Sequence, residues 1–222
     1  MDEPPIREKT LARLPRDKDA TRFWWIRHAP VPEVRDVMYG SMDVDCDCSD
    51  EFVFKAVAAR LPDNAKWFHS PLKRTKQTVD ALLATGVKAQ SLTEDPRIIE
   101  MNFGDYNGRK LDELMAERKD CYLGFFPTTP FETTPNGESL SDVAKRVAAF
   151  TDDMHQKHAG EDIVVVAHRG TILAMLHNAL QLPLKTSVSF RIDNVSLSRM
   201  WRYANIPADG PQYKLGEVGW LP

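Results

Sequence analysis

Two apolar runs along the chain have no helical period, and each is followed directly by a histidine. Residues 23–26 (Phe-Trp-Trp-Ile) precede Arg27 and His28, and residues 163–167 (Ile-Val-Val-Val-Ala) precede His168. Short, continuous apolar runs are typical of strands that are buried in a parallel sheet. Because open α/β sheets bind ligands beyond the carboxyl ends of their strands, we expect both histidines at a ligand-binding edge.

Helical periods and further short strands alternate through the rest of the sequence. Ser49 or Asp50 can cap a helix that extends to Arg60, and we expect Ser70-Pro71 to begin another helix with the proline at its first position. The expected apolar face of the helix that ends at Arg60 is Phe52, Val53, Ala56, Val57 and Leu61. The other expected elements are helices at residues 111–118, 140–158 and 171–180 and strands at residues 66–69, 89–93, 189–191, 197–203 and 213–218. This alternation predicts an α/β fold, a three-layer α/β/α arrangement with a mainly parallel central sheet.

The composition is typical of one globular domain. The chain has 222 residues, of which 42% are hydrophobic and 27% charged, which is enough for one substantial core. We expect a flexible N-terminal tail at residues 1–20, which are charged and contain prolines, and a single domain at residues 21–222. A net charge of −3 gives no field that would attract nucleic acid or an anionic membrane, so neither partner is expected. The sequence does not distinguish a monomer from a homodimer.

The N-terminus and the cysteines indicate the cellular compartment. The longest apolar stretches are far shorter than the roughly 18 residues that span a bilayer, and the charged N-terminus has no apolar segment of a secretory signal. Three cysteines are too few for a disulfide framework, and Cys46 and Cys48, which alternate with aspartates, fit no common zinc spacing. These features predict a cytoplasmic protein with inert thiols and no metal.

Two further charged residues extend the candidate site. Arg74 falls in the first turn of the helix expected after Pro71, beside the free N–H groups of a helix N-terminus. Glu100 lies between apolar neighbours in a loop or strand end. Arginines fork two N–H bonds to phosphate oxygens, a neutral imidazole can attack phosphorus, and a carboxyl that is desolvated enough to stay protonated can protonate the departing oxygen. Together these groups could perform a two-step phosphoryl transfer through a phosphohistidine.

The order of the motifs resembles that of the histidine phosphatase superfamily, which has a phosphoglycerate mutase-like fold. The motifs that carry the resemblance are Arg27-His28-Ala29, the run from Ser70-Pro71 through Arg74 to Thr78, Glu100-Met101-Asn102-Phe103-Gly104, Pro135-Asn136-Gly137-Glu138-Ser139 and His168-Arg169-Gly170. The resemblance therefore covers most of the chain after the expected tail.

The resemblance implies a role for each matched residue. His28 would be the nucleophile and Glu100 the proton donor, and later the base that activates water. Arg27, Arg74 and His168 would form the phosphate pocket and stabilise charge on the transferring group, and no metal or cofactor would be required. Three positions depart from the family. Ala29 stands where glycine is more frequent. Arg169, which stands where a small residue is usual, would either add a cation at the pocket mouth or point to solvent. Val34 stands where a polar phosphate-binding residue is common.

The substrate class is inferred from an irregular segment at residues 121–137. This segment has no lysine or arginine and four aromatic residues, Tyr122, Phe125, Phe126 and Phe131, so we expect a lid that suits an uncharged or partly apolar leaving group. The prediction is a phosphomonoesterase for a small phosphorylated metabolite. The opening Arg-His-Ala-Pro and the later Tyr39-Gly40 also resemble the α-ribazole phosphatase branch of the family.

Three alternatives remain open. The first is a 2,3-bisphosphoglycerate-dependent phosphoglycerate mutase on the same fold. The second is a catalytically weak module that binds a phosphorylated ligand, which the valine at position 34 favours. The least favoured is a metal enzyme that uses His28, Glu100 and His168 as ligands, because two arginines would repel the cation.

Overall fold

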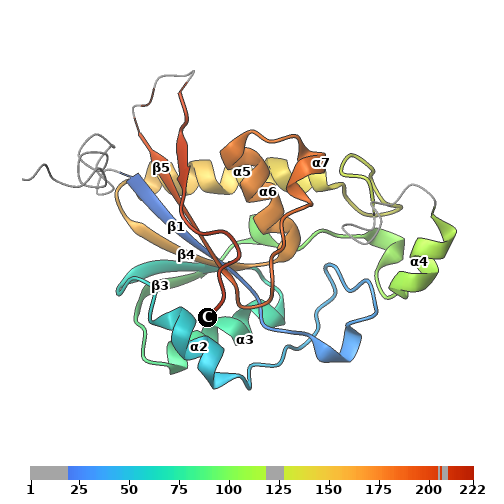
Figure 1. Cartoon of the computed structure of the whole chain (residues 1–222), viewed down its shortest axis with the longest axis horizontal. Coiled ribbons are helices and arrows are strands. Elements are labelled where there is room, and N and C mark those ends of the chain that lie inside the picture. The colour runs from blue at the N-terminus through green and yellow to red at the C-terminus, as the bar shows by residue number, and fades with distance from the viewer. Residues whose placement is uncertain (1–19, 119–127, 205, 207–209) are drawn as a thin grey trace, which may run out of the picture.

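A six-stranded sheet forms the centre of the part of the chain that the structure describes, with the strand order β3-β2-β4-β1-β5-β6 (Figure 1). The structure is a computed structural model that describes residues 20–118, 128–204, 206 and 210–222. The strands are β1 (Ala20–Arg27), β2 (Ala65–His69), β3 (Ala89–Glu94), β4 (Asp162–Ala167), β5 (Leu197–Tyr203) and β6 (Tyr213–Leu215). Strands β1 to β4 are mutually parallel, β5 pairs antiparallel with β1, and β6 pairs antiparallel with β5.

Helices cover both faces of this sheet (Figure 1). One face carries α5 (Leu140–Lys157), α6 (Arg169–Leu180) and the short α7 (Leu184–Ser187), and the other carries α2 (Glu51–Ala58) and α3 (Lys73–Ala84). Helix α4 (Leu111–Glu117) and three 3-10 turns, Pro32–Val34, Pro96–Ile98 and Gly104–Tyr106, lie in the connections. The expected three-layer α/β/α fold with a mainly parallel sheet is confirmed.

Alternating side chains of the central strands supply two separate apolar cores. In β1, Phe23 and Trp25 point into the core under α5 and α6, whereas Ile26 points into the core under α2 and α3. All three side chains are fully buried. Because both faces of β1 are covered, its sequence is a continuous apolar run and not an alternating one.

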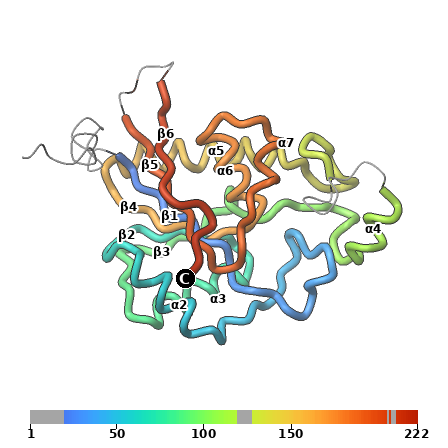
Figure 2. The backbone as a smooth tube through the Cα atoms, viewed as in Figure 1, coloured from blue at the N-terminus to red at the C-terminus, as the bar shows by residue number. Residues whose placement is uncertain are grey.

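The chain returns along β5 after β6 and ends beside α2 (Figure 2). Trp220 forms an isolated bridge with Leu197, and the Arg60 guanidinium lies 4.1 Å from the centre of the Trp220 ring. The C-terminal segment thus closes the edge of the core beneath α2. No helix in the described ranges is long and apolar enough to cross a membrane.

Two local predictions are wrong. The helix expected from Ser70-Pro71 begins at Lys73, because the Ser70 hydroxyl accepts the Leu72 N–H at 3.3 Å and so closes a turn before the helix. Residues 189–191 are not a strand. The N–H groups of Ser189 and Phe190 bond back to α7, as in the 3.2 Å bond from Phe190 N to the Ser187 carbonyl.

The buried face of α2 also differs from the expected one. Phe52 is 71% exposed, whereas Phe54, Val57, Ala58 and Leu61 are buried. Both sets of residues have helical spacing, and only the packing of α2 against α3 and the sheet selects between them.

Several expectations fall on residues that the structure does not describe. The expected tail lies outside the described residues except for Ala20, which already belongs to β1. Tyr122, Phe125 and Phe126 of the expected lid also lie outside them. Phe131 is described and is 70% exposed.

Candidate active site

The carboxyl ends of β1 and β4 place two histidine rings side by side. The strands are adjacent and parallel, with Arg27 opposite Ala167. The residues that follow this pair are His28 after β1 and His168 after β4. The ring centres are 5.2 Å apart. The side chains are 1% and 0% exposed. The register of two buried strands therefore fixes this pair.

The hydrogen bonding of His28 defines which nitrogen is available. Its Nδ1 lies 2.7 Å from the carbonyl oxygen of Ala29. A carbonyl only accepts, so Nδ1 carries the hydrogen and, in the neutral ring, Nε2 carries the free lone pair. Burial, with added repulsion from Arg27 and Arg74, lowers the pKa of His28 well below its ordinary value, although the Ala29 carbonyl opposes this. The ring is thus neutral at pH 7, with the free lone pair on Nε2.

His168 is a buried polar group without a partner among the described protein atoms. Neither Nδ1 nor Nε2 has a hydrogen bond, although the backbone N–H of His168 donates to the Thr171 hydroxyl at 3.0 Å. Burial lowers the pKa of His168 well below its ordinary value, and Arg74 and His28 lower it further. Native structures seldom leave buried polar groups unpaired, so this ring is typical of a site that receives a ligand.

Arg74 reaches the same region from the first turn of α3. Its side chain is 0% exposed, and its terminal nitrogens donate to the carbonyl oxygens of Met42 at 2.7 Å and Gly40 at 2.6 Å. The guanidinium carbon lies 5.1 Å from the centre of the Tyr39 ring, and Nε has no partner. The loop after β1 therefore holds a fully buried cation next to the two histidines, whose pKa values that cation lowers.

Two more arginines approach from β1 and α6. Arg27 donates from Nη1 to the Ile192 carbonyl at 2.7 Å, and Arg169 donates from Nη2 to the Val188 carbonyl at 3.3 Å. Burial lowers the pKa of Arg169, Arg27 lowers it further, and Glu100 opposes the shift. The Arg169 side chain is half-buried and lies within electrostatic reach of Arg27 and Glu100. Of the two orientations expected for it, this is closer to the one at the mouth of the pocket than to the one that points to solvent.

Glu100 is fixed by backbone groups on two sides. Its Oε1 accepts the Met101 N–H at 2.9 Å, and its Oε2 accepts the Gly170 N–H at 3.3 Å in the first turn of α6. A Cβ at position 170 would lie 2.4 Å from Oε1, so only glycine leaves room for the carboxylate as it stands. The structure thus brings together His28, His168, Arg27, Arg74, Arg169 and Glu100.

Several residues that support the site were not singled out from the sequence. The Thr78 hydroxyl accepts the Ala29 N–H at 2.9 Å, and the Asn194 side-chain amide donates to the His28 carbonyl at 2.9 Å. Val195 has φ of +57°, which is strained for a β-branched residue, and its N–H bonds the Arg27 carbonyl at 3.0 Å. Gly170 had a detectable signal, a glycine directly after His-Arg at a helix start, but the other contacts join distant segments and have no local signature.

Two further residues lie at the end of β2 and after β1. His69 ends β2 and its Nδ1 lies 2.7 Å from the Ser70 carbonyl, which satisfies the ring locally. Val34 lies half-buried in the 3-10 turn after β1.

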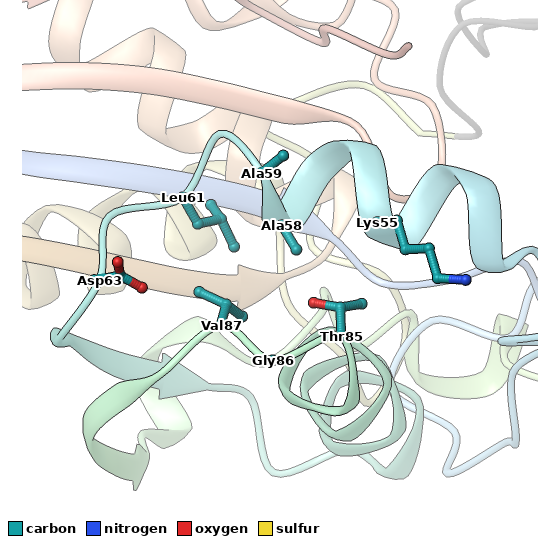
Figure 3. A pocket seen from close by; sticks show the side chains of 8 residues that line it. All are labelled: Lys55, Ala58, Ala59, Leu61, Asp63, Thr85, Gly86 and Val87. Carbon is teal, nitrogen blue, oxygen red and sulfur yellow. The ribbon is translucent and has the colours of Figure 1, made fainter.

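An open pocket of about 350 Å³ lies near the C-terminal ends of α2 and α3 (Figure 3). Leu61, Val87 and Asp63 are among its lining residues, and the lining residue Lys55 pairs with Glu51 at 2.7 Å. Because α3 carries Arg74 at its start and ends at Ala84, about 15 Å of helix, at ~1.5 Å per residue, separates Arg74 from the end of α3 at the pocket. We assign it no role in the site.

The fold and site define a phosphoglycerate mutase-like α/β protein with a histidine pair at the carboxyl edge of its sheet. The chain belongs to the histidine phosphatase superfamily (branch 1), whose family model matches residues 23–207.

Curated relatives include enzymes with two kinds of name. Phosphoserine phosphatase 1 of Hydrogenobacter thermophilus is 31% identical over 131 residues, which cover 59% of this chain and 61% of that protein. A probable phosphoglycerate mutase of Yersinia pestis is 30% identical over 131 residues, with 59% and 60% coverage. The match thus spans about 60% of the length of these relatives.

Solved structures show the same fold over nearly the whole chain. The mycobacterial glucosyl-3-phosphoglycerate phosphatase has a TM-score of 0.74 at 22% identity, covering 88% of this chain and 97% of that one. A putative α-ribazole-5′-phosphate phosphatase from Escherichia coli has a TM-score of 0.70 at 21% identity, with 89% and 95% coverage. At these identities the likeness establishes the fold alone.

Proposed function

We propose that this protein is a phosphomonoesterase that hydrolyses a small phosphorylated metabolite through a phosphohistidine on His28. The observation that carries the proposal is the orientation of His28. Its Nδ1 hydrogen is held by the Ala29 carbonyl, so Nε2 is free beside the unpartnered His168 ring, near the buried Arg74 and the half-buried Arg27. The family supports phosphatase activity.

In the first step, the Nε2 lone pair of His28 forms a bond to phosphorus. The bond from phosphorus to the ester oxygen breaks, and that oxygen takes a proton from Glu100 and leaves as an alcohol. Arg27, Arg74 and His168 surround the phosphoryl group and stabilise the negative charge on its oxygens.

In the second step, a water oxygen forms the new bond to phosphorus while Glu100 accepts its proton. The bond from phosphorus to Nε2 breaks and its electron pair returns to the ring. Inorganic phosphate leaves, and both His28 and Glu100 regain their starting protonation states. These residues need no metal for either step.

The substrate is a small molecule whose phosphate fits between the arginines. The relatives carry the names of enzymes for phosphoserine and phosphoglycerate, and the structural neighbours those of phosphatases for glucosyl-3-phosphoglycerate and α-ribazole phosphate. An α-ribazole phosphatase-like activity, with an uncharged leaving group, is our specific proposal. A phosphoglycerate mutase is the second candidate, because the half-buried Arg169 supplies a cation that a second acidic group needs.

We further propose that the protein works in the cytoplasm, with neither nucleic acid nor a membrane as a partner. The net charge of −3 supports the absence of these two partners, since it provides no attraction for polyanions.

The test is a screen of phosphoserine, 3-phosphoglycerate, α-ribazole phosphate, sugar phosphates and nucleotides with release of inorganic phosphate as the readout. We expect phosphate release and a ³²P label that the H28A variant loses. The matched control is H69Q, which alters another strand-end histidine with the same local hydrogen bond and should keep the label. Conversion of 3-phosphoglycerate to its isomer without free phosphate would replace the phosphatase by the mutase. If the wild type shows no turnover and the H28A variant binds the phosphorylated ligand with unchanged affinity, the protein is a binding module.

A further inference from the structure

The loop between β1 and α2 carries two thiols in contact. Cys46 and Cys48 alternate with aspartates, so both side chains lie on one side of the chain, and their sulfurs are 3.6 Å apart. Both are free and half-buried. A disulfide has an S–S length of about 2.05 Å, so the sulfurs must approach by about 1.6 Å, which side-chain rotation in an irregular loop can provide.

The two sulfurs are not equivalent. The contact with Cys48 lowers the pKa of Cys46, and Thr78 and Arg74 lower it further, although burial and Asp45 oppose them. The same contact raises the pKa of Cys48. Since the thiolate is the reactive form, the lowered pKa favours Cys46 as the sulfur that reacts first.

We propose that Cys46 and Cys48 form an oxidative modification site, at which a hydroperoxide converts the dithiol to an intramolecular disulfide and a thiol reductant restores it. The Cys46 sulfur attacks the terminal peroxide oxygen, which breaks the O–O bond and gives a sulfenic acid and an alcohol, or water from hydrogen peroxide. The Cys48 sulfur then attacks the Cys46 sulfur, and the sulfenic hydroxyl leaves as water with the Cys48 proton. Two thiols and one hydroperoxide thus give one disulfide, one alcohol and one water.

Cys46 connects this pair to segments that carry the candidate active site. The Cys46 thiol donates to the Arg74 carbonyl at 3.3 Å, and the Cys46 N–H donates to the Gln77 side chain at 2.9 Å. Its sulfur lies 3.8 Å from the Thr78 hydroxyl, which also accepts the N–H of Ala29. The Asp47 N–H donates to the Pro30 carbonyl at 2.7 Å, so the thiols lie between the segment after His28 and the first turns of α3.

Disulfide formation removes the thiol that donates to Arg74 and draws the loop toward Cys48. The same loop supplies the carbonyl oxygens of Gly40 and Met42 that orient the Arg74 guanidinium. A displacement of about 1 Å in a substrate-positioning group can cost up to 10²-fold in rate, so we expect oxidation to lower activity by about tenfold.

A zinc site is a weaker interpretation of the same pair. Structural zinc takes four ligands. Among the described residues no group of three or more His, Cys, Asp or Glu side chains is arranged to hold a metal ion. Two sulfurs in contact are suited to forming a bond with each other.

The experiment uses the full chain with C121S, which leaves Cys46 and Cys48 as its only thiols. The protein is treated with increasing hydrogen peroxide, denatured, and alkylated with N-ethylmaleimide. Without oxidant we expect two alkylated thiols. After oxidation we expect none, with a loss of 2 Da in the tryptic peptide of residues 36–55 and recovery with dithiothreitol. C46S/C121S and C48S/C121S are matched controls that should never show this loss.

Three outcomes would overturn the site: thiols that remain alkylated, oxidation that stops at sulfinic or sulfonic acid, or disulfides between chains. The mass measurement does not depend on the proposed function. If neither redox form has phosphatase activity, the proposed function is wrong, but the mass shift still shows whether the disulfide forms. If activity exists but does not change on oxidation, the coupling to Arg74 is wrong.

Discussion

The contact between Gly170 and Glu100 offers a substitution, the addition of one methyl group, that should lower the rate of catalysis without lowering the stability of the fold. In a Gly170→Ala variant the new Cβ would lie 2.4 Å from Glu100 Oε1. An ordinary contact is about 3.4 Å or more, so the carboxylate has to withdraw by about 1 Å. The Glu100 oxygens are the far end of a flexible side chain, and Gly170 does not have a positive φ. Alanine also favours a helix over glycine by about 1 kcal/mol. The fold should therefore tolerate the change.

The rate should fall because the displaced group is the proposed proton donor. A misplacement of about 1 Å costs about 10²-fold, within the roughly 10²–10⁴-fold that general acid catalysis contributes. The loss should depend on the leaving group. An alkyl phosphate needs the departing oxygen to be protonated, whereas p-nitrophenyl phosphate releases a stable anion. We expect kcat/KM of G170A to fall about 10²-fold on the alkyl ester and much less on the nitrophenyl ester.

A double-mutant cycle with E100A provides the control. If the methyl group acts only through the carboxylate, G170A should change the rate of E100A by less than about twofold. Thermal unfolding of G170A should show a midpoint at or above that of the wild type. An unaltered rate of G170A on the alkyl phosphate, or an equal loss in the E100A background, would refute the assignment of Glu100 as the donor.

Three further predictions follow from other parts of the structure. The pKa values of His28 and His168 are lowered in the folded state, so the unfolded chain binds more protons below pH 6.5 and stability is lost as the pH falls through that value. Each ring should contribute at most about 1.4 kcal/mol per pH unit to the slope of the free energy of unfolding against pH. In urea unfolding between pH 7 and 5, the H168Q variant should therefore show a shallower slope than the wild type. Equal slopes for the two proteins would contradict the burial argument. An R74K variant keeps the charge but loses the forked guanidinium that donates to the carbonyls of both Met42 and Gly40. In steady-state assays its kcat/KM should fall about 10- to 100-fold. Full activity of R74K would show that the charge alone suffices. In α2, F54A should lower the free energy of unfolding by about 3–5 kcal/mol, whereas its matched control F52A should change it by less than about 0.5 kcal/mol; equal losses would show that Phe52 also packs.

The strand pattern could be predicted from the sequence because it has a strong local cause. Continuous apolar runs at residues 23–26 and 163–167 are typical of strands covered on both faces, and parallel strands deliver their following residues to one edge. That argument was sufficient to anticipate that the rings of His28 and His168 lie together. The long period of α5 and its Ser139 cap were equally local signals.

Other features depended on contacts that no local pattern contains. Helix α2 has two sets of apolar residues with helical spacing, one that includes Phe52 and one that includes Phe54. Phe54 and not Phe52 is buried because of how the helix packs against the sheet. The segment at residues 189–191 has the composition of a strand, but its N–H groups are used by the turn that ends α7. The placement of Glu100 depends on Gly170, which is seventy residues away in the sequence.

The direction of β5 has a consequence for how this molecule can change over evolution. In a wholly parallel sheet, the connection that enters a strand lies at the edge opposite to the ligand. Here β5 runs against β1, so residues 188–196 enter it beside His28, and this connection supplies the carbonyl groups of Val188 and Ile192 and the amide of Asn194. Insertions or deletions at this one connection would change the groups that hold Arg27, His28 and Arg169 while every strand pairing stays in place, so the candidate site can vary here separately from the sheet.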